Sequence, residues 1–599
     1  MKKRVTYSAF RLFQILCLSF MICFVQSCSD DHDDSIDLTD EVTAIKKLIL
    51  DGSLLLETKA YGSDTELVFE TVSLTIPTDR INSLETDKKS WNTTLILDGN
   101  KMNIPTLGES FKPEKIKLDP TGYAPLTLRL NYFLMVEGKL EMRIKSKDEE
   151  VQDITHQFWK YGYNHEIDVH GLYPDYLNTV YITITDKDGK ARITDTLEVQ
   201  TQDISKITNN VSANLVKADF NKMEPGLTLV NSSNQSILPH YSYMIDALGN
   251  IRWIIVTNNH PELMKLTNTG NGFRRSKNGN FIAGSRENSM IYEINMVGEV
   301  VKMWDIGALG VGFHHDLIEI PNGNILLASM KFGDTKANGD PATLDYFVEL
   351  DRETGKIVTE WDLKKSMDET RDLIRVAGQA KSNWAHGNAA YYIEDEDAIV
   401  VSLRYQGVVK LDRQNRVKWI LAPHDGFSSS GRGESLKPFL LNPLDSGGNY
   451  ISDESIISGK TSSDVFDWSW SQHSSLIMPN GNLLVFDNGY FRNFENEDNS
   501  YSRVVEYKID EKNNTVQQIW EYGKERPELF TMVGGSCVYL PETGNILFGG
   551  GNNIRNSNGK EGGRIIEIDP KTNEVVWEIE INEPNGSAFH YASHISLYP

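Results

Sequence analysis

The sequence predicts an all-β protein, with a six-bladed β-propeller preceded by a smaller N-terminal β-sandwich-like domain. Three observations carry this prediction. A turn, a polar loop and a β-run ending on tryptophan recur six times, the same region contains Gly-centred hairpin turns, and residues 41–215 alternate apolar and polar side chains without that repeat. Alternation with a period of two is typical of half-buried strands.

The tryptophan motif sets the number and period of the units. Its first and last copies read DALGNIRW and DPKTNEVVW, and the tryptophans are spaced by 51, 57, 58, 101 and 57 residues. A period of about 50 residues fits a four-stranded propeller blade. The six residues are Trp253, Trp304, Trp361, Trp419, Trp520 and Trp577. The long interval indicates an insertion at 422–467, rich in Ser, Gly and Pro, which we expect to lie as a loop over the channel mouth.

Hairpin turns recur in the same units. They read SKNGN, PNGN, PNGN and PETGN, beginning at Ser276, Pro321, Pro479 and Pro541. Asn-Gly provides the positive φ that a tight hairpin turn needs. The propeller is therefore placed at 216–599. We expect the final HYASHISLYP to complete the last blade by pairing with a strand that begins near residue 220.

Residues 41–215 contain runs such as LTLRLNYFLMV and TVYITITDKDGKARITDTLEVQ, the second with a hairpin turn at its centre. These runs predict a separate β-sandwich-like domain. No candidate catalytic residues group within it. We expect it to support the propeller or to form a homodimer interface.

The N-terminus has the features of an export signal. MKKRVTYSAF carries three basic residues and precedes an apolar run that is too short for a stable transmembrane span. Residues 1–28 end on Val-Gln-Ser-Cys, which resembles a bacterial lipobox whose lipidated residue would be Cys28; an ordinary signal peptide with an incidental cysteine is the alternative. Residues 29–40 are acidic and predict a solvated tether. We expect an exported lipoprotein anchored by lipid to the outer membrane, on its periplasmic or cell-surface face.

Charge and cysteine content exclude several classes. The chain has 84 acidic and 60 basic residues and a net charge of −24, which argues against a nucleic-acid partner. Cys17 and Cys23 lie in the signal and Cys28 would be lipidated, so only Cys537 belongs to the folded part. The mature fold therefore has no internal disulfide and no Cys-based zinc site.

Three histidines occupy corresponding places in three blades. His315, His386 and His473 each begin the first strand of a hairpin, about six residues before its turn. Propeller symmetry would place all three at one level of the central channel. His314 would point away from the channel, because side chains alternate along a strand.

The neighbouring strands add polar groups to this site. Asn388 shares a strand with His386, and antiparallel geometry returns Arg404 beside the same histidine. Asp487 and Asn488 would return near His473 in the same way. Three imidazoles suit a metal, but a guanidinium directed at the site would repel a cation and matches the oxygens of a tetrahedral oxyanion. We therefore expect an oxyanion site with no metal or other cofactor.

These motifs together resemble the bacterial arylsulfate sulfotransferases. HHD, W-x-H-x-N with an arginine eighteen residues after the histidine, and Q-H followed by PNGN carry the resemblance, with the final LYP. It implies that a propeller-channel histidine is transiently sulfurylated in ping-pong kinetics. The implied partners are a phenolic sulfate donor and a phenol acceptor.

The resemblance also implies roles for individual residues. His473 corresponds to the nucleophile, and His315, His386, Asn388 and Arg404 would hold the sulfuryl oxygens or handle the phenolic proton. Ser536 and Tyr591 would bind substrate. One departure is the disulfide that family enzymes carry in the propeller, which this chain cannot form. Two other interpretations stay open at this point: a metal-dependent propeller lyase or hydrolase acting on acidic polysaccharide, and a non-catalytic binding propeller.

Overall fold

The computed structural model describes residues 5–6 and 40–598, apart from 88–91, 107–111, 186, 188, 190, 233–239, 267–271, 374–380, 496–499 and 584–588. Cys28 and the rest of the expected lipobox lie outside the described residues. No helix in the described part of the chain is long and apolar enough to cross a membrane. The described chain is dominated by strands, as the sequence predicts.

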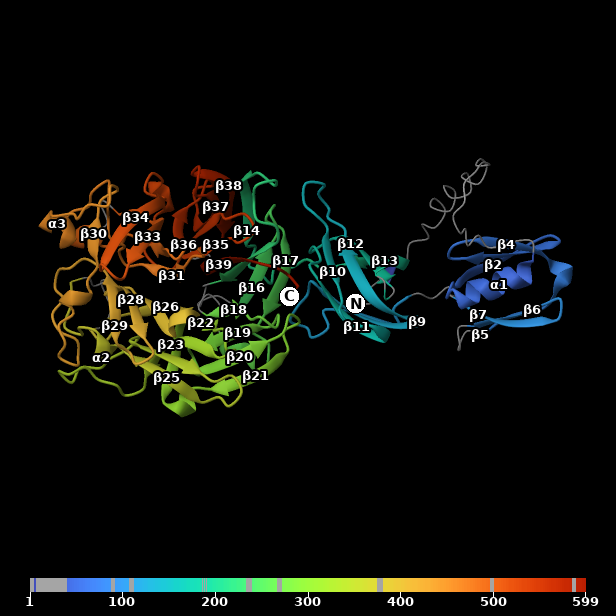
Figure 1. The fold of residues 1–599 in the computed structure, drawn as a ribbon, viewed down its shortest axis with the longest axis horizontal. Coiled ribbons are helices and arrows are strands. Elements are labelled where there is room, and N and C mark those ends of the chain that lie inside the picture. Colours follow the sequence, from blue (N-terminus) through green and yellow to red (C-terminus); the bar gives the residue numbers. More distant parts are fainter. Residues whose placement is uncertain are drawn as a thin grey trace.

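The N-terminal part contains two β units with separate cores (Figure 1). The first β unit, residues 41–106, packs helix α1 (Glu41–Leu50) against two three-stranded sheets through Ala44, Ile45 and Leu48. Asp40 caps this helix by accepting a hydrogen bond from the Val42 N–H. Its sheets are β2 (Leu55–Tyr61), β3 (Asp64–Phe69) and β4 (Ser73–Pro77), and β5 (Ile81–Asp87), β6 (Asn92–Leu97) and β7 (Asn100–Pro105).

The second β unit, residues 115–202, is organised around one long strand, β9 (Thr127–Ile144). The first part of β9 pairs with β8 and β11, and its second part pairs with β10 and β12. The strands are β8 (Lys115–Leu118), β10 (Ile154–Gln157), β11 (Gly162–His170), β12 (Leu177–Thr185) and β13 (Ala191–Gln200), with β1 (Val5–Thr6) beside β13. The single sandwich expected over 41–215 thus corresponds to two units, because most apolar residues before 107–111 form one core and those after it belong to another, which Leu54 also joins.

The described residues of 212–598 form six sheets of four or five strands, antiparallel except for the β30–β34 pair, and this is the number of units in the tryptophan repeat. Blade 1 contains β39 (Phe589–Ile595), β15 (Leu227–Ser232), β16 (Tyr241–Ile245) and β17 (Ile251–Val256). Blade 2 contains β18 (Phe273–Arg275), β19 (Phe281–Ser285), β20 (Met290–Ile294) and β21 (Val300–Asp305). Blade 3 contains β22 (Val311–Glu319), β23 (Ile325–Lys331), β24 (Tyr346–Leu350) and β25 (Ile357–Asp362), followed by α2 (Leu363–Ser366).

The other three blades have the same order. Blade 4 contains β26 (Gly387–Ile393), β27 (Ala398–Leu403), β28 (Gly407–Asp412) and β29 (Val417–Leu421). Blade 5 contains β31 (His473–Ile477), β32 (Leu483–Asp487), β33 (Arg503–Asp510), β34 (Thr515–Tyr522) and β30 (Asn442–Leu444). Blade 6 contains β35 (Ser536–Tyr539), β36 (Ile546–Arg555), β37 (Glu561–Asp569), β38 (Glu574–Asn582) and β14 (Ser212–Ala218).

The two ends of the propeller region close the ring twice. The C-terminal strand β39 pairs with β15, so it becomes the inner strand of blade 1, and the first strand β14 pairs with β38 at the outer edge of blade 6. The expected pairing of HYASHISLYP with an early strand is therefore confirmed. Each closure joins residues more than 350 positions apart, so both ends of the propeller region are held in its sheets.

The six tryptophans link neighbouring blades. Each lies in the fourth strand of its blade, and each indole N–H donates a hydrogen bond to the turn, begun by Asp or Asn, that precedes the fourth strand of the next blade. The acceptors are Met296 O for Trp253, Arg352 O for Trp304, Asp412 O for Trp361, Glu511 Oε1 for Trp419, Asn573 Oδ1 for Trp520 and Ala247 O for Trp577, at 2.5–3.0 Å. The last bond joins blade 6 to blade 1. The repeat seen in the sequence is thus a ring of equivalent inter-blade contacts.

The insertion at 422–467 differs from its expected position over the channel mouth. Its strand β30 pairs in parallel with β34 as the outermost strand of blade 5, and helix α3 (Glu454–Ile457) follows. Leu441 and Phe466 are buried in a core shared with blades 4 and 5. These apolar contacts hold the insertion at the outer edges of the blades.

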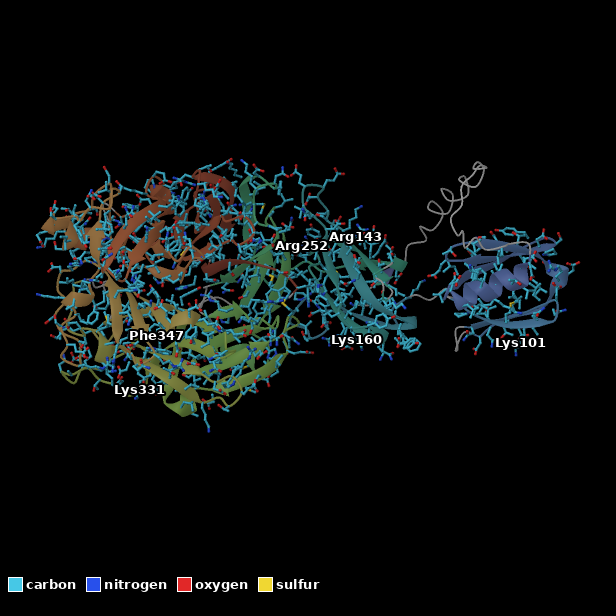
Figure 2. The ribbon with its side chains drawn as sticks, in the orientation of Figure 1. Lys101, Arg143, Lys160, Arg252, Lys331 and Phe347 are labelled. Atoms are coloured by element: carbon cyan, nitrogen blue, oxygen red, sulfur yellow. The ribbon has the colours of Figure 1, made fainter. Side chains whose placement is uncertain are left out.

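The second β unit is joined to the propeller through blade 1 and the C-terminus. Arg252 of β17 lies at this junction, where its Nε donates to the Gly171 carbonyl at 2.9 Å and its guanidinium stacks on the Tyr173 ring (Figure 2). The Tyr598 hydroxyl accepts a hydrogen bond from the His170 N–H at 2.7 Å, and its ring stacks on His156. The chain segment directly after β39 is therefore held by the second β unit.

Candidate active site

A small cavity lies where the inner strands of all six blades meet. Its lining residues are Arg274 from blade 2, His315 and Asp316 from blade 3, Asn388 and Ala389 from blade 4, His473 and Ser474 from blade 5, Gly535 from blade 6, and His590 and Tyr591 from blade 1. A cavity that draws on every inner strand is a segment of the central channel. We call it the channel site.

The structure brings the three predicted histidines together at this site. The ring centroids of His315 and His386 are 4.6 Å apart, and His473 lines the same cavity as His315. Each inner strand shifts its pairing register at the histidine, and left-handed φ values of 56°, 55° and 49° occur at His315, His386 and Ser474. Such β-bulges redirect a side chain at the edge of a sheet. In blade 4 the turn after His386 begins at Glu394, two residues later than the six-residue spacing predicts.

A fourth histidine, His590, belongs to the channel site and was not predicted. Its ring centroid lies 5.4 Å from that of His473 and 5.9 Å from that of His315. The three predicted histidines were found by counting back from a hairpin turn. His590 lies in β39, whose pairing partner is 360 residues earlier, so no turn marks it. Its place at the start of an inner strand is the signal that could have identified it.

Asn488 fixes the tautomer of His473. The Asn488 amide nitrogen donates to the carbonyls of Thr531 and Gly534, at 2.9 and 2.8 Å, so its Oδ1 faces the imidazole. His473 Nδ1 lies 2.7 Å from this oxygen and must donate to it. In the neutral ring, Nε2 then carries the lone pair. Asn488 returns beside His473 as the antiparallel geometry predicts.

A second chain of hydrogen bonds fixes His315. His314 Nε2 lies 2.6 Å from the Ser329 carbonyl and must donate to it, which leaves Nδ1 of His314 as an acceptor. His315 Nδ1 lies 3.0 Å from this atom and donates to it. His315 therefore also carries its lone pair on Nε2, and His314 acts through His315, consistent with its predicted orientation away from the channel.

His386 has the opposite tautomer. Its Nδ1 lies 2.7 Å from the Asn383 amide nitrogen and accepts a hydrogen bond from it, so the ring proton lies on Nε2. This Nε2–H is buried and has no acceptor among the described residues. A buried donor without a partner costs about 1–3 kcal/mol, which a ligand oxygen would recover.

Arg404 and Asn388 take the predicted places beside His386. The Arg404 main-chain N–H donates to the His386 carbonyl at 3.1 Å, and its Nη2 donates to the Met532 carbonyl at 3.0 Å. Arg404 Nε is buried without a partner in the described structure. The Asn388 amide nitrogen donates to the Gln472 carbonyl at 2.8 Å, directly before His473, and so supports the strand that bears this histidine.

Burial sets the protonation of these imidazoles. Desolvation lowers the pKa of His315, His386 and His473 well below the ordinary value, and the positive charge of Arg404 lowers the pKa of the last two further. Desolvation, with Arg274 and Arg404, lowers the pKa of His590 to about 4. At pH 7 all four rings are neutral, which is the nucleophilic form of imidazole.

Other predicted residues lie in different surroundings. The Ser536 hydroxyl donates to the Ala592 carbonyl and accepts from the Ala592 N–H, both at 3.0 Å, so it joins β35 to β39 and is directed away from the channel. The Tyr591 ring lies against the Arg274 guanidinium at 3.1 Å and lines the channel site. Asp487 pairs with Arg492 and Arg503 and forms part of the scaffold of blade 5. Burial raises the pKa of Cys537 to about 12, which keeps the thiol protonated.

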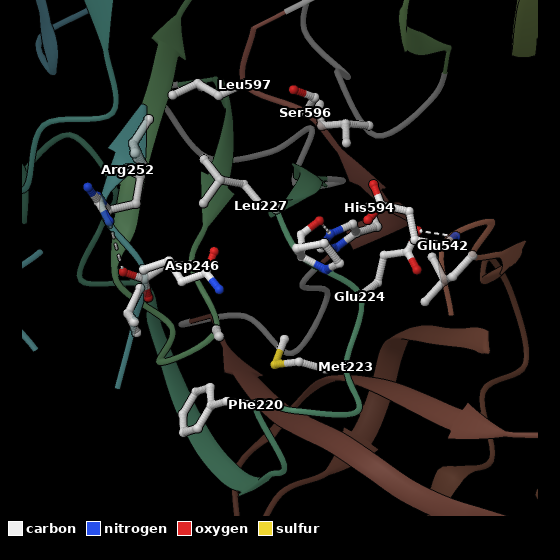
Figure 3. Close-up of a pocket in the computed structure, with 18 of the residues that line it drawn as sticks. Phe220, Met223, Glu224, Leu227, Asp246, Arg252, Glu542, His594, Ser596 and Leu597 are labelled. Atoms are coloured by element: carbon white, nitrogen blue, oxygen red, sulfur yellow. Dashed lines mark hydrogen bonds and ion pairs between the residues drawn. The ribbon is translucent and has the colours of Figure 1, made fainter. Parts of the chain in front are cut away.

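A larger cavity, of about 760 Å³, lies between the second β unit, blades 1 and 6 and the C-terminal segment (Figure 3). It contains the buried Asp246–Arg252 ion pair together with Glu224 and His594. None of the four channel histidines lines it. In the described part of the chain, no group of three or more His, Cys, Asp or Glu residues is arranged to hold a metal ion. In the channel site, by contrast, the buried donors His386 Nε2 and Arg404 Nε converge with three further imidazoles, and such groups suit oxyanion chemistry.

Comparisons with known proteins match most of the chain to one family. Residues 212–592 match the family model of the arylsulfotransferases (ASST), and residues 115–202 match the arylsulfotransferase Ig-like domain. The arylsulfate sulfotransferase AssT of Escherichia coli O6:H1 is 29% identical over 558 residues, which cover 79% of this chain and 91% of that protein. The enzyme of the same name from Lelliottia amnigena is 29% identical over 557 residues, covering 80% and 91%.

Similarity to solved structures is weaker. A protein of unknown function from Bacteroides caccae is matched with a TM-score of 0.34 and 12% identity, over 59% of this chain and 94% of that one. The family model, by contrast, spans more than half of the chain and includes the inner strands that carry all four channel histidines. The chain belongs to the arylsulfotransferase family.

Proposed function

We propose that the protein is an arylsulfate sulfotransferase that moves a sulfuryl group from a phenolic sulfate ester to another phenol through a covalent adduct on His473. The observation that carries this proposal is the orientation of Asn488, which binds the Nδ1 proton and leaves a lone pair on Nε2 of His473. A neutral imidazole with its tautomer fixed in this way is prepared for nucleophilic attack.

In the first half-reaction, the Nε2 lone pair of His473 attacks sulfur. A nitrogen–sulfur bond forms, the bond from sulfur to the aryl oxygen breaks, and the phenolate leaves with the electron pair. His386 Nε2–H and the Arg404 guanidinium donate hydrogen bonds to the sulfuryl oxygens. A loose transition state of this type, like that of phosphoryl transfer, is stabilised mainly by position and charge.

In the second half-reaction, the oxygen of the acceptor phenol attacks the same sulfur and the nitrogen–sulfur bond breaks. Its electron pair returns to Nε2 of His473. The phenolic proton passes to Nε2 of His315, whose lone pair is fixed by His314. The imidazolium of His315 can then return this proton to the next leaving phenolate, so the complete cycle consumes no proton.

The test is to trap the adduct. After brief incubation with p-nitrophenyl sulfate and no acceptor, mass spectrometry should find about 80 Da, the mass of SO₃, on the peptide containing His473, as expected for a covalent nucleophile. The adduct should disappear when a phenol is added. His473→Ala should form no adduct, whereas His315→Ala should form an adduct that persists after phenol is added. An adduct on another residue, or ping-pong turnover by His473→Ala, would contradict the assignment.

For the location of this activity, we propose an exported lipoprotein anchored through Cys28. The lipobox-like sequence ending on this residue and the acidic tether after it support the proposal. Export would place the reaction outside the cytoplasm. A phenolic sulfate ester suits this location as the donor, because the reaction then needs no nucleotide-activated sulfate.

A further inference from the structure

We propose that His590 is a third hydrogen-bond donor to the sulfuryl oxygens in the channel site, and so a catalytic residue. This inference rests on the proposed sulfuryl transfer. It assigns a function to the strand that closes the propeller ring.

The position of His590 fits this role. It lies at the start of the inner strand β39, and the centroid of its ring is 5.4 Å from that of the His473 ring. The two rings are therefore neighbours, and His590 does not occupy the position opposite the nucleophile, where the leaving phenolate would lie. The Gly535 N–H donates to the His590 carbonyl at 3.1 Å, which fixes the backbone. Gly534 packs against the ring so closely that a Cβ there would lie 3.3 Å from Cδ2. The imidazole is therefore held at the side of the nucleophile, where a non-bridging sulfuryl oxygen would lie.

The hydrogen-bonding capacity of His590 is also unused. His315, His386 and His473 each use Nδ1 in a bond within the protein. Neither ring nitrogen of His590 has a hydrogen-bond partner among the described residues, and its ring contacts are those with His315 and His473. One N–H of the neutral ring is thus available to a ligand that enters the channel site.

The geometry of the transferred group calls for a donor on this side. A sulfuryl group has three non-bridging oxygens, which become nearly coplanar in a loose transition state. His386 and Arg404 both approach from blade 4. Blade 1 lies three positions further around the ring of six, on the opposite wall, and His590 is the channel imidazole that it contributes. Donors on both walls can bind oxygens that point in different directions.

The protonation of His590 is compatible with donation. Its pKa of about 4 keeps the ring neutral at pH 7, with desolvation as the main cause and Arg274 and Arg404 as further causes. Arg274 is itself paired with Asp316, with Nε 3.0 Å from Oδ1. The nearby Tyr591 ring covers this guanidinium. A neutral donor stabilises charge on oxygen and does not act as a competing acid.

The experiment compares His590→Ala, His590→Asn and the control His594→Ala. His594 lies on the same strand, but its Nε2 donates to the Pro225 carbonyl and it lines the larger cavity. Rapid-mixing measurement of p-nitrophenol release gives the rate of the first half-reaction. Removing one oxyanion donor costs about 10²–10³-fold in rate, so His590→Ala should lose that much, His590→Asn should recover part of it through its amide N–H, and His594→Ala should match the wild type.

A series of acceptor phenols separates oxyanion donation from a general-base role. If His590 binds a sulfuryl oxygen, the His590→Ala loss in the second half-reaction should be the same for acceptors of different pKa. A loss that grows with acceptor pKa would show that His590 takes the phenolic proton and would overturn the proposal, as would wild-type rates in His590→Ala. Failure of the wild type to form the His473 adduct would instead refute the proposed function, so the two failures are distinguishable.

Discussion

Asn383→Asp should reverse one hydrogen bond in the channel site with almost no change in shape. Asn383 donates to Nδ1 of His386 across 2.7 Å, which places the ring proton on Nε2. A carboxylate can only accept, so the neutral ring would move its proton to Nδ1 and present a lone pair to the sulfuryl oxygen. The site then loses one donor, and we expect kcat at pH 7.5 to fall about 10²–10³-fold.

The same variant should respond to pH in a direction that the wild type does not show. The new carboxylate beside the ring raises the pKa of His386 above its strongly lowered wild-type value. Below that pKa the ring carries protons on both nitrogens, and the Nε2–H donor returns. The activity of Asn383→Asp should therefore rise as pH falls from 8 to about 5, whereas the wild type should show no such gain.

The assay is the pre-steady-state release of p-nitrophenol across this pH range. Asn415→Asp is a matched control, because Asn415 is a buried asparagine that donates to the Asp362 carbonyl at 2.8 Å, outside the channel. A rate for Asn383→Asp within about threefold of the wild type at every pH, far smaller than the expected loss of a donor, would refute the tautomer assignment.

Two further predictions concern acid stability and export. Burial lowers the pKa of His314 to about 3, whereas the unfolded chain takes up this proton near 6.5. Its contribution to stability is therefore fully present above pH 6.5 and is lost as pH falls toward 3. By pH 4.5 it should cost about 3 kcal/mol of unfolding free energy, seen as a lower urea midpoint, and His314→Asn should show a shallower pH dependence. Metabolic labelling with a fatty-acid probe should tag the wild type and not Cys28→Ser; equal labelling would rule out lipidation at this residue.

The sequence predicted the features that repeat in every blade. It could not predict which residues from distant parts of the chain become neighbours when the ring closes. The tryptophan repeat identified six units because every indole makes an equivalent contact with the next turn. His315, His386 and His473 were found because the hairpin turns that follow them also recur from blade to blade. His590 was missed because its strand pairs with residues 360 positions earlier, and the role of Asn383 was missed because only distances reveal which atom faces His386.

The outer parts were predicted less completely. Alternation identified strands in residues 41–215, but periodicity does not show which strands share a core, and so the two units were read as one domain. The composition of 422–467 suggested a loop, because its few buried apolar residues, such as Leu441 and Phe466, are widely spaced among polar ones. Ser536 was expected at the substrate, and its hydroxyl instead joins two strands.

The closing strand β39 has a consequence for when activity can first appear. His590 and Tyr591 reach the channel only after β39 pairs with β15, and the segment after β39 is secured by Tyr598 against the second β unit. During synthesis, every other residue that lines the channel site emerges before this strand does. A nascent chain in which β39 has not yet paired therefore lacks His590 and Tyr591 at the channel site, and its site is incomplete. A protein fused to the C-terminus would be attached to the segment that Tyr598 holds against the second β unit. Such a fusion should therefore slow the pairing of β39 with β15.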